Sequence, residues 1–200
     1  MGRTSKAIRL TDDDGNILDI ENDHIPTIAT AHQKIHDGKH FNVIFTNECT
    51  NTDEQTVIAF KTPVSGEIHL IFAASSTALA TAFIYKDTSI DVGEGTEKTP
   101  QNRNQQSATV PTVLSIESTP SVGEVTTYNE TQAAGANITT TTEVTSRPLG
   151  AAAVPRSIGG ESRGTQEWIL EADTEYAFVV NSDDNNDNIH WIELDWYEED

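Results

Sequence analysis

Apolar and polar side chains alternate over many short stretches of the chain, and this period-two pattern is typical of β-strands. The pattern predicts strands over residues 41–46, 55–62, 67–73, 78–86, 108–117, 124–130, 166–171, 175–181 and 188–198. Pro111 places the fifth of these at a sheet edge or a bulge, because proline cannot donate to the strand ladder. Many short strands with little helix between them predict an all-β sandwich or barrel.

One predicted strand is apolar on both of its faces. In residues 78–86, Phe83 and Tyr85 share one face with Leu79, while Ala82 and Ile84 lie on the other. A strand of this kind is buried on both sides. The pattern therefore indicates either the interior of a sandwich or an interface between subunits, and the sequence leaves both open.

Three segments depart from the strand pattern. Residues 1–24 are polar and charged, which predicts an N-terminal arm that is ordered only by a partner, ahead of one domain over 25–200. Apolar spacing over residues 27–38, with Gly38 as a stop signal, predicts a short helix. Residues 131–165 contain few large apolar side chains. Because ordering costs roughly 1–2 kcal/mol per residue, we expect an extended loop there.

The charge of the chain excludes some classes of binding partner. The 200 residues include 12 Lys and Arg against 32 Asp and Glu, a net charge of −20. Nucleic acids and anionic membrane surfaces would repel such a chain, so neither is expected as a partner. No run approaches the roughly 20 apolar residues that span a bilayer. The start of the chain has no apolar signal-peptide core, so we expect no secretion signal.

Candidate chemistry is sparse along the chain. No nucleophile elbow, phosphate-binding loop or dinucleotide fingerprint occurs, so we expect no catalysis, no catalytic residues and no cofactor. The single cysteine, Cys49, excludes an internal disulfide and predicts a buried or loop thiol without a nucleophilic role. His32, His36 and His40 are spaced by four, but Gly38 ends the helix before His40, so no metal site is expected. A cupin-like metal site using His32, His36 or His69 is an alternative, and cation binding by the acidic loops stays open.

Short motifs in a fixed order give the chain a resemblance to a known family. The motifs are Ile-His-Asp-Gly-Lys-His-Phe at 35–41, Asn-Arg-Asn at 102–104, Gly-Gly-Glu-Ser-Arg-Gly at 159–164, Glu-Trp-Ile-Leu at 167–170, Thr-Glu-Tyr at 174–176 and Ile-Glu-Leu-Asp-Trp-Tyr-Glu at 192–198. In this order they resemble the capsid decoration, or cement, proteins of tailed bacteriophages. The resemblance covers about residues 35–198 and implies an antiparallel jelly-roll β-sandwich.

The resemblance implies a structural role without catalysis. We expect a virion protein, made in the host cytoplasm, that binds the assembled capsid surface and stabilises it. Its expected partners are the major capsid protein and further copies of itself, as a homotrimer or another homo-oligomer. The residues expected at the capsid or subunit interface are Arg103, Arg147, Arg156, Arg163, Trp191 and Tyr197.

An alternative keeps the virion but moves the protein to the tail, neck or a fibre. The aromatic side chains near the C-terminus, among them Trp191 and Trp196, would then contact a host surface glycan. A jelly roll serves either role, so the fold alone does not choose between them.

Overall fold

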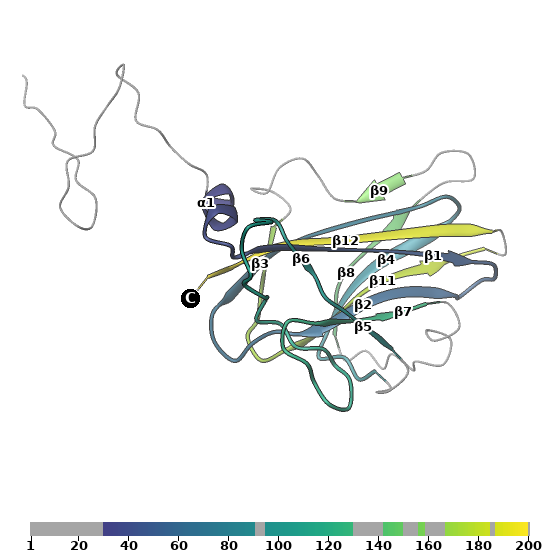
Figure 1. Cartoon of the computed structure of the whole chain (residues 1–200). Helices are drawn as coiled ribbons and strands as arrows, with labels where there is room; N and C mark the ends of the chain where they lie inside the picture. Colours follow the sequence, from purple (N-terminus) through teal and green to yellow (C-terminus); the bar gives the residue numbers. More distant parts are fainter. Residues whose placement is uncertain are drawn as a thin grey trace, which may run out of the picture. The chain divides into compact units, whose positions relative to one another are not determined.

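The computed structural model describes residues 30–90, 95–129, 142–149, 156–158, 167–184 and 187–199. Residues 31–200 form one compact unit, and the expected arm over 1–24 lies outside the described residues. In this unit, two antiparallel sheets form the expected all-β sandwich (Figure 1). None of the helical residues that can be described belongs to a helix long and apolar enough to cross a bilayer.

Each of the two sheets contains six strands. Sheet 1 has the spatial order β10 (Glu167–Leu170), β3 (Glu67–Ser76), β12 (Asn188–Glu199), β1 (His40–Cys49) and β6 (Gln101–Asn102), and β9 (Arg156–Ile158) also pairs with β3. Sheet 2 has the order β5 (Thr96–Lys98), β7 (Val125–Tyr128), β2 (Gln55–Lys61), β11 (Glu175–Ser182), β4 (Ala80–Lys86) and β8 (Thr142–Leu149).

Eight of these strands follow the order of a jelly roll. Strands β1, β12, β3 and β10 are neighbours in sheet 1, and β2, β11, β4 and β8 are neighbours in sheet 2. Along the chain, successive members of this set alternate between the sheets, except that β4 and β8 pair within sheet 2. Double-sheet jelly rolls have this arrangement of eight strands in two Greek keys. The expected jelly-roll-like sandwich with a short helix is therefore confirmed.

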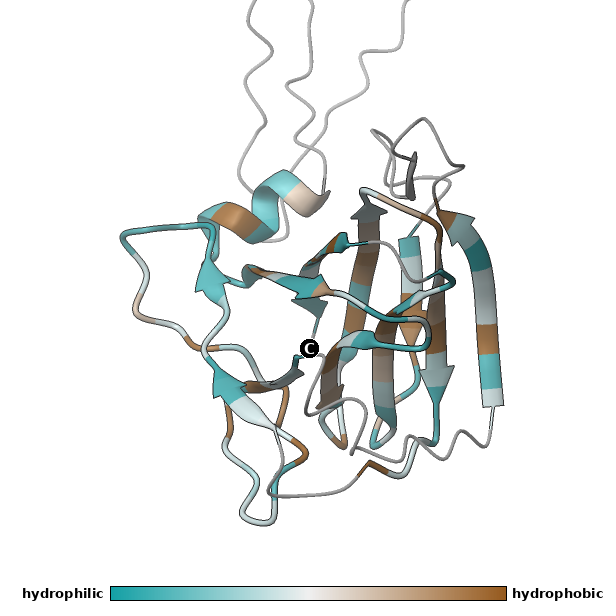
Figure 2. Cartoon of the chain, turned by 90° about the vertical axis from the view of Figure 1, so that its right-hand side faces the viewer, coloured by the Kyte–Doolittle hydropathy of each residue, from teal (hydrophilic) through white to brown (hydrophobic). Residues whose placement is uncertain are grey.

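The main core lies between the two sheets. Every second residue of β3 is buried, which matches the alternation in the sequence. Trp196 of β12 stacks on Phe60 of β2 with ring centroids 6.0 Å apart, and Phe60 stacks on Phe178 of β11 at 5.6 Å. All three side chains are completely buried. Figure 2 shows the alternation as bands of hydrophobic and hydrophilic colour along the strands.

A second apolar cluster covers the outer face of sheet 2. Its buried members are Val57, Ala59, Ile90, Ile116, Tyr128, Ala177 and Val179. Phe83 and Tyr85 of β4 pack against this cluster, while Ala82 and Ile84 of the same strand face the main core. Packing within one chain therefore accounts for the strand that is apolar on both faces.

Two expectations about the elements are wrong. Residues 108–117 form no strand, and Leu114 makes only isolated bridges. The segment 131–165, expected as an extended loop, contains β8 and β9. Strand β8 pairs with β4, with one register shift between Ile84 and Tyr85 of β4. Leu149 is completely buried, and Val144 packs against the main core. An edge strand needs only these few apolar contacts, so its sequence shows little alternation.

The predicted helix is present as α1 (Thr30–His36). Gly38, at φ +70°, ends it, and a Cβ at this position would lie 2.3 Å from the Ser107 hydroxyl oxygen. Only glycine fits such a left-handed, crowded turn. The chain then enters β1 at His40, so His40 does not share a helix face with His32 and His36.

Candidate functional site

Three ring side chains form a row on the outer face of sheet 1. Tyr197 of β12 pairs in register with His40 of β1 on one side and with His69 of β3 on the other. The His69 ring stacks on Tyr197 with centroids 4.6 Å apart and planes inclined by 10°. The His40 ring meets the same tyrosine edge-on, at 6.2 Å. Acidic side chains surround this His40–Tyr197–His69 row at both ends.

His40 lies in a closed hydrogen-bond network. Its Nε2 lies 2.9 Å from Oδ1 of Asp195, and its Nδ1 lies 3.2 Å from the carbonyl oxygen of Ala31 in α1. The Arg103 guanidinium donates to the other Asp195 oxygen, and the Arg103 backbone N–H donates to the carbonyl of His40. Because both carboxylate oxygens are engaged, this network fixes α1 and the 102–104 loop onto β1 and β12.

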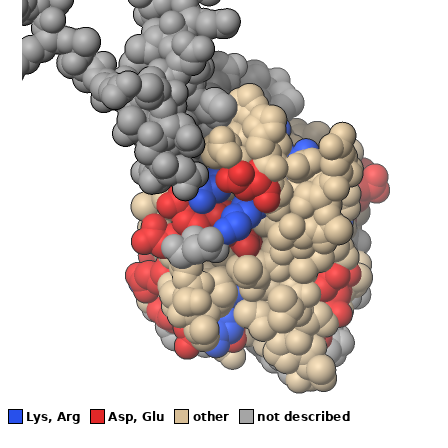
Figure 3. All heavy atoms as spheres, turned by 60° about the vertical axis from the view of Figure 1, so that its left-hand side comes forward, with Lys and Arg blue, Asp and Glu red and all other residues tan. Residues whose placement is uncertain are grey.

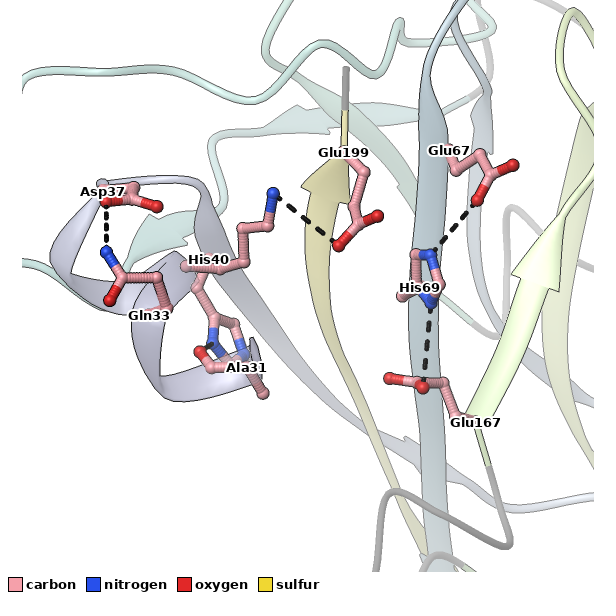
Figure 4. Close-up of polar contacts among 9 residues, drawn as sticks. Ala31, Gln33, Asp37, His40, Glu67, His69, Glu167 and Glu199 are labelled. Atoms are coloured by element: carbon pink, nitrogen blue, oxygen red, sulfur yellow. Dashed lines mark hydrogen bonds and ion pairs between the residues drawn. The ribbon is translucent and has the colours of Figure 1, made fainter. Parts of the chain in front are cut away.

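His69, at the other end of the row, has a different environment. Its side chain is 12% exposed, and neither buried ring nitrogen makes a hydrogen bond. Nε2 lies 3.4 Å from Oε2 of Glu67 and Nδ1 lies 3.7 Å from Oε2 of Glu167 (Figure 4). Glu199, opposite Glu67 in the strand register, completes a group of three potential metal ligands with His69 and Glu67. The three ligand atoms lie within 4.8 Å of one another.

A cleft of about 310 Å³ opens beside this group, with Glu67, Glu198 and Glu199 in its lining. The Glu198 carboxylate accepts hydrogen bonds from the Thr112 backbone N–H at 2.9 Å and from Trp196 Nε1 at 3.3 Å. Burial raises the pKa of Glu198, and these hydrogen bonds oppose that rise in part. Figure 3 brings the α1 end of the sandwich forward and shows Lys and Arg side chains lying among Asp and Glu side chains.

Beyond the row, the outer face of sheet 1 carries apolar side chains. Ile44 of β1 is 42% exposed, Ile189 of β12 is 44% exposed and Ile169 of β10 is 62% exposed. Trp191 of β12 is half-buried on the same face, paired in register with Ser75 of β3. Hydrophobic residues scattered singly on a surface are ordinary, but Ile44, Ile189 and Trp191 lie on the adjacent strands β1 and β12 of one sheet face. We refer to the region formed by Ile44, Ile169, Ile189 and Trp191 as the sheet 1 outer face.

A second polar cluster lies inside the sandwich. His190 is completely buried, with Nδ1 3.0 Å from the Thr56 hydroxyl and 3.4 Å from the Cys49 sulfur. Its Nε2 lies 3.1 Å from the Ser182 hydroxyl. Burial lowers the pKa of His190 to about 4, although Asp183 and Glu54 act in the opposite direction. Cys49 is also completely buried, so a substrate cannot reach this Cys–His pair without opening of the fold.

The structure describes the side chains of four of the six residues expected at an interface. Arg103 is bound to Asp195, Tyr197 is buried between the two histidines, and Trp191 lies half-buried on the sheet 1 outer face. Arg147 is exposed on β8, the edge strand of sheet 2. Arg156 begins β9, and Arg163 lies outside the described residues. Arg103 and Arg147, the two arginines whose side chains are described, therefore lie at different sheets.

Two sequence hypotheses change once the side chains are placed. His32 and His36 stack on α1 with Nε2 atoms 3.2 Å apart, whereas His40 faces Asp195. Trp196 is completely buried in the main core, so it cannot contact a glycan. Sequence reasoning also missed Glu67, Glu167 and Glu199 around His69. The alternation Glu67-x-His69 on one strand face was the available signal, but acidic residues are too frequent in this chain to identify the other two.

Comparison with models of protein families, with curated proteins and with solved structures gives no significant match to this chain.

Proposed function

We propose that this chain is a structural protein of a tailed-bacteriophage virion that binds the assembled capsid as a decoration protein and stabilises it. Two observations support the role. The ordered motifs between residues 35 and 198 resemble such proteins, and the chain folds as a jelly-roll sandwich. Fold alone does not define a function, so the proposal also requires a surface suited to binding.

The difference between the two outer faces carries the proposal. The outer face of sheet 2 is covered by the chain itself, through the cluster that contains Ile90 and Ile116. On the sheet 1 outer face, by contrast, Ile44 and Ile189 are more than two-fifths exposed. Burying such side chains against a partner contributes about 25 cal/mol per Å² of apolar area. We take the capsid shell as the partner of this face.

Several copies of the same weak contact would together give stable binding. A homo-oligomer, such as a trimer, binds a lattice of identical capsid subunits at several points, and each later contact is intramolecular. The strong negative charge of the chain keeps unbound copies soluble and apart. The expected partners are thus the major capsid protein and further copies of this chain, and its expected location is the capsid surface.

The test is to add purified protein to capsids that lack it and to measure occupancy and resistance to heat. A double variant, Ile44→Asp with Ile189→Asp, places charge on the sheet 1 outer face and should reduce occupancy at least tenfold. Val64→Asp is the matched control, because Val64 is 79% exposed but lies in the turn between β2 and β3. Equal occupancy of the wild type and the double variant would refute the assignment of this face.

One observation keeps a second role in consideration. Trp191 lies outward and half-buried on β12, where an indole can stack on a sugar. In a tail, neck or fibre protein, Trp191→Ala would abolish binding to host cells or surface polysaccharide and leave the fold intact. Copy number separates the two roles, because a shell protein is present in hundreds of copies and a tail or neck protein in about three to twelve.

A further inference from the structure

The group formed by Glu67, His69 and Glu199 has the geometry of a metal site. Glu67 and His69 are two residues apart on β3 and therefore point to the same outer face, and Glu199 of β12 is the register partner of Glu67. With metal–ligand bonds of about 2.0–2.1 Å, two ligands of a tetrahedral zinc ion lie about 3.4 Å apart. The distance from His69 Nε2 to Glu67 Oε2 is 3.4 Å.

The state of the imidazole is an independent observation that points to a ligand. Both ring nitrogens of His69 are shielded from solvent, and neither has a hydrogen-bond partner. Buried polar atoms in folded proteins nearly always have a partner, because leaving one unsatisfied costs about 1–3 kcal/mol. Tyr197 holds the ring in place by stacking, so the ring cannot turn freely to find one. A metal ion at Nε2 would supply the missing partner.

Glu167 adds a feature typical of protein metal sites. Its Oε2 lies 3.7 Å from Nδ1, on the side of the His69 ring opposite to Glu67, as Figure 4 shows. Histidines that bind metals usually donate their second N–H to a carboxylate or a carbonyl, which orients the ring and increases its basicity. Glu167 is placed for that role, and a small shortening of this contact would complete the bond.

The charges of the cluster favour a cation. Three carboxylates face one imidazole, and the Lys34 ammonium lies 3.6 Å from Oε1 of Glu199. Lys39 also lines the adjoining cleft. A carboxylate has two oxygens, so Glu199 can contact both Lys34 and a metal. The Glu67 side chain is 62% exposed, so it can move toward a bound ion.

We propose that Glu67, His69 and Glu199 bind a divalent transition-metal ion of the Zn²⁺ class, with Glu167 positioning the imidazole. One imidazole with two carboxylates suits Zn²⁺ better than Mg²⁺ or Ca²⁺, which prefer ligand sets made only of oxygen. The bound ion would join the end of β12 to β3 beside the cleft. Because all of its ligands come from one chain, the purified protein should bind the ion without the capsid.

The competing explanation is a proton in place of a metal. A doubly protonated His69 would form ion pairs with Glu67 and Glu167 across the two measured distances. The two explanations predict different behaviour toward added metal, since an imidazolium has no lone pair to offer. Loss of the Lys34 ammonium beside Glu199 should favour metal binding, because it removes a positive charge near the site.

The experiment is a calorimetric titration of the full chain, stripped with a chelator and free of any affinity tag, with ZnCl₂, MnCl₂, MgCl₂ or CaCl₂ at pH 7.5. We expect one Zn²⁺ per chain and at least tenfold weaker binding of Mg²⁺ and Ca²⁺. His69→Gln and Glu67→Gln should each weaken Zn²⁺ binding more than tenfold, and Glu167→Gln about tenfold. Lys34→Met should strengthen it.

Two control variants exclude other ligands. His36→Gln disrupts the exposed pair of histidines on α1, and Glu48→Gln removes an exposed carboxylate of β1. Both variants should bind Zn²⁺ as the wild type does. Glu67→Gln also controls for misfolding. Because the Glu67 side chain is largely exposed, the melting temperature of this variant without metal should equal that of the wild type. No Zn²⁺ binding by the wild type, unchanged affinity in Glu67→Gln and His69→Gln, or loss only in His36→Gln would each overturn the proposal.

Discussion

The buried imidazole of His190 makes the stability of this protein depend on pH in a defined way. In the folded chain burial lowers the pKa of His190 from 6.5 to about 4, so the ring is neutral there at pH 5. The unfolded chain binds a proton on this ring at the ordinary pKa. Because the unfolded state takes up the proton at the higher pH, the folded state loses stability as the pH falls from about 6.5 toward 4.

The size of the effect follows from the two pKa values. The pKa difference corresponds to at most about 3 kcal/mol of unfolding free energy, and about 2 kcal/mol of this is lost by pH 5. The hydroxyls of Thr56 and Ser182, 3.0 and 3.1 Å from the ring nitrogens, both suit a neutral imidazole. A hydroxyl can either donate or accept, so one nitrogen keeps its hydrogen and the other its lone pair.

The assay is urea unfolding of the wild type and of His190→Gln at pH 7.5 and pH 5.0. The variant lacks the titrating ring, so the wild type should lose about 2 kcal/mol more than the variant between the two pH values. Thr56→Val is the control, because it disturbs the same cluster but keeps the imidazole, and it should retain the wild-type pH dependence. If His190→Gln does not fold, an NMR titration of the wild-type ring gives the same information.

Two results would refute this reasoning. One is an equal loss of stability for the wild type and His190→Gln between pH 7.5 and 5.0. The other is protonation of the folded His190 ring near pH 6.5 in the NMR titration. Either result would mean that the ring exchanges protons with solvent in the folded state, against its complete burial.

Three further predictions test the packing. Trp196→Ala should lower the unfolding free energy by about 3–5 kcal/mol in urea, because the indole is completely buried against Phe60, and a native-like value would place it outside the core. Leu149→Ala on β8 should lower the unfolding free energy by about 2–5 kcal/mol, because this side chain is buried. Arg147→Ala on the same strand should change it by no more than about 0.5 kcal/mol, because Arg147 is exposed, and equal effects of the two variants would mean that β8 does not pack on the core. Gly66→Ala should lower the melting temperature, since φ is +87° and its Cβ would lie 2.6 Å from the carbonyl oxygen of Glu199; an unchanged melting temperature would contradict that turn.

Most of the sandwich could be predicted from the sequence because its central strands alternate strictly. Residues 67–73 and 188–198 place one set of side chains in the main core, and this pattern survives in the structure. Strand β8 was not predictable, because an edge strand exposes most of its side chains and carries only Val144 and Leu149 toward the core. The apolar residues of 108–117 predicted a strand, but Pro111 limits pairing and the segment makes only isolated bridges.

The candidate site was largely beyond sequence reasoning because it depends on strand register. Tyr197 was expected at an interface, but it lies between His40 and His69 only because β12 pairs with both β1 and β3. Pairings between strands so distant in sequence are set by the whole fold, and one residue of slip would turn these side chains to the other face. The link between Arg103 and Asp195 likewise joins a loop to a strand that no local pattern connects.

A cryo-electron microscopy map of the phage particle that carries this protein would test the central claim most directly. The account predicts many copies on the outside of the shell, with Ile44, Ile189 and Trp191 buried against the capsid protein or a neighbouring copy. Density confined to the tail, or copies on the shell whose sheet 1 outer face is turned to solvent, would contradict it.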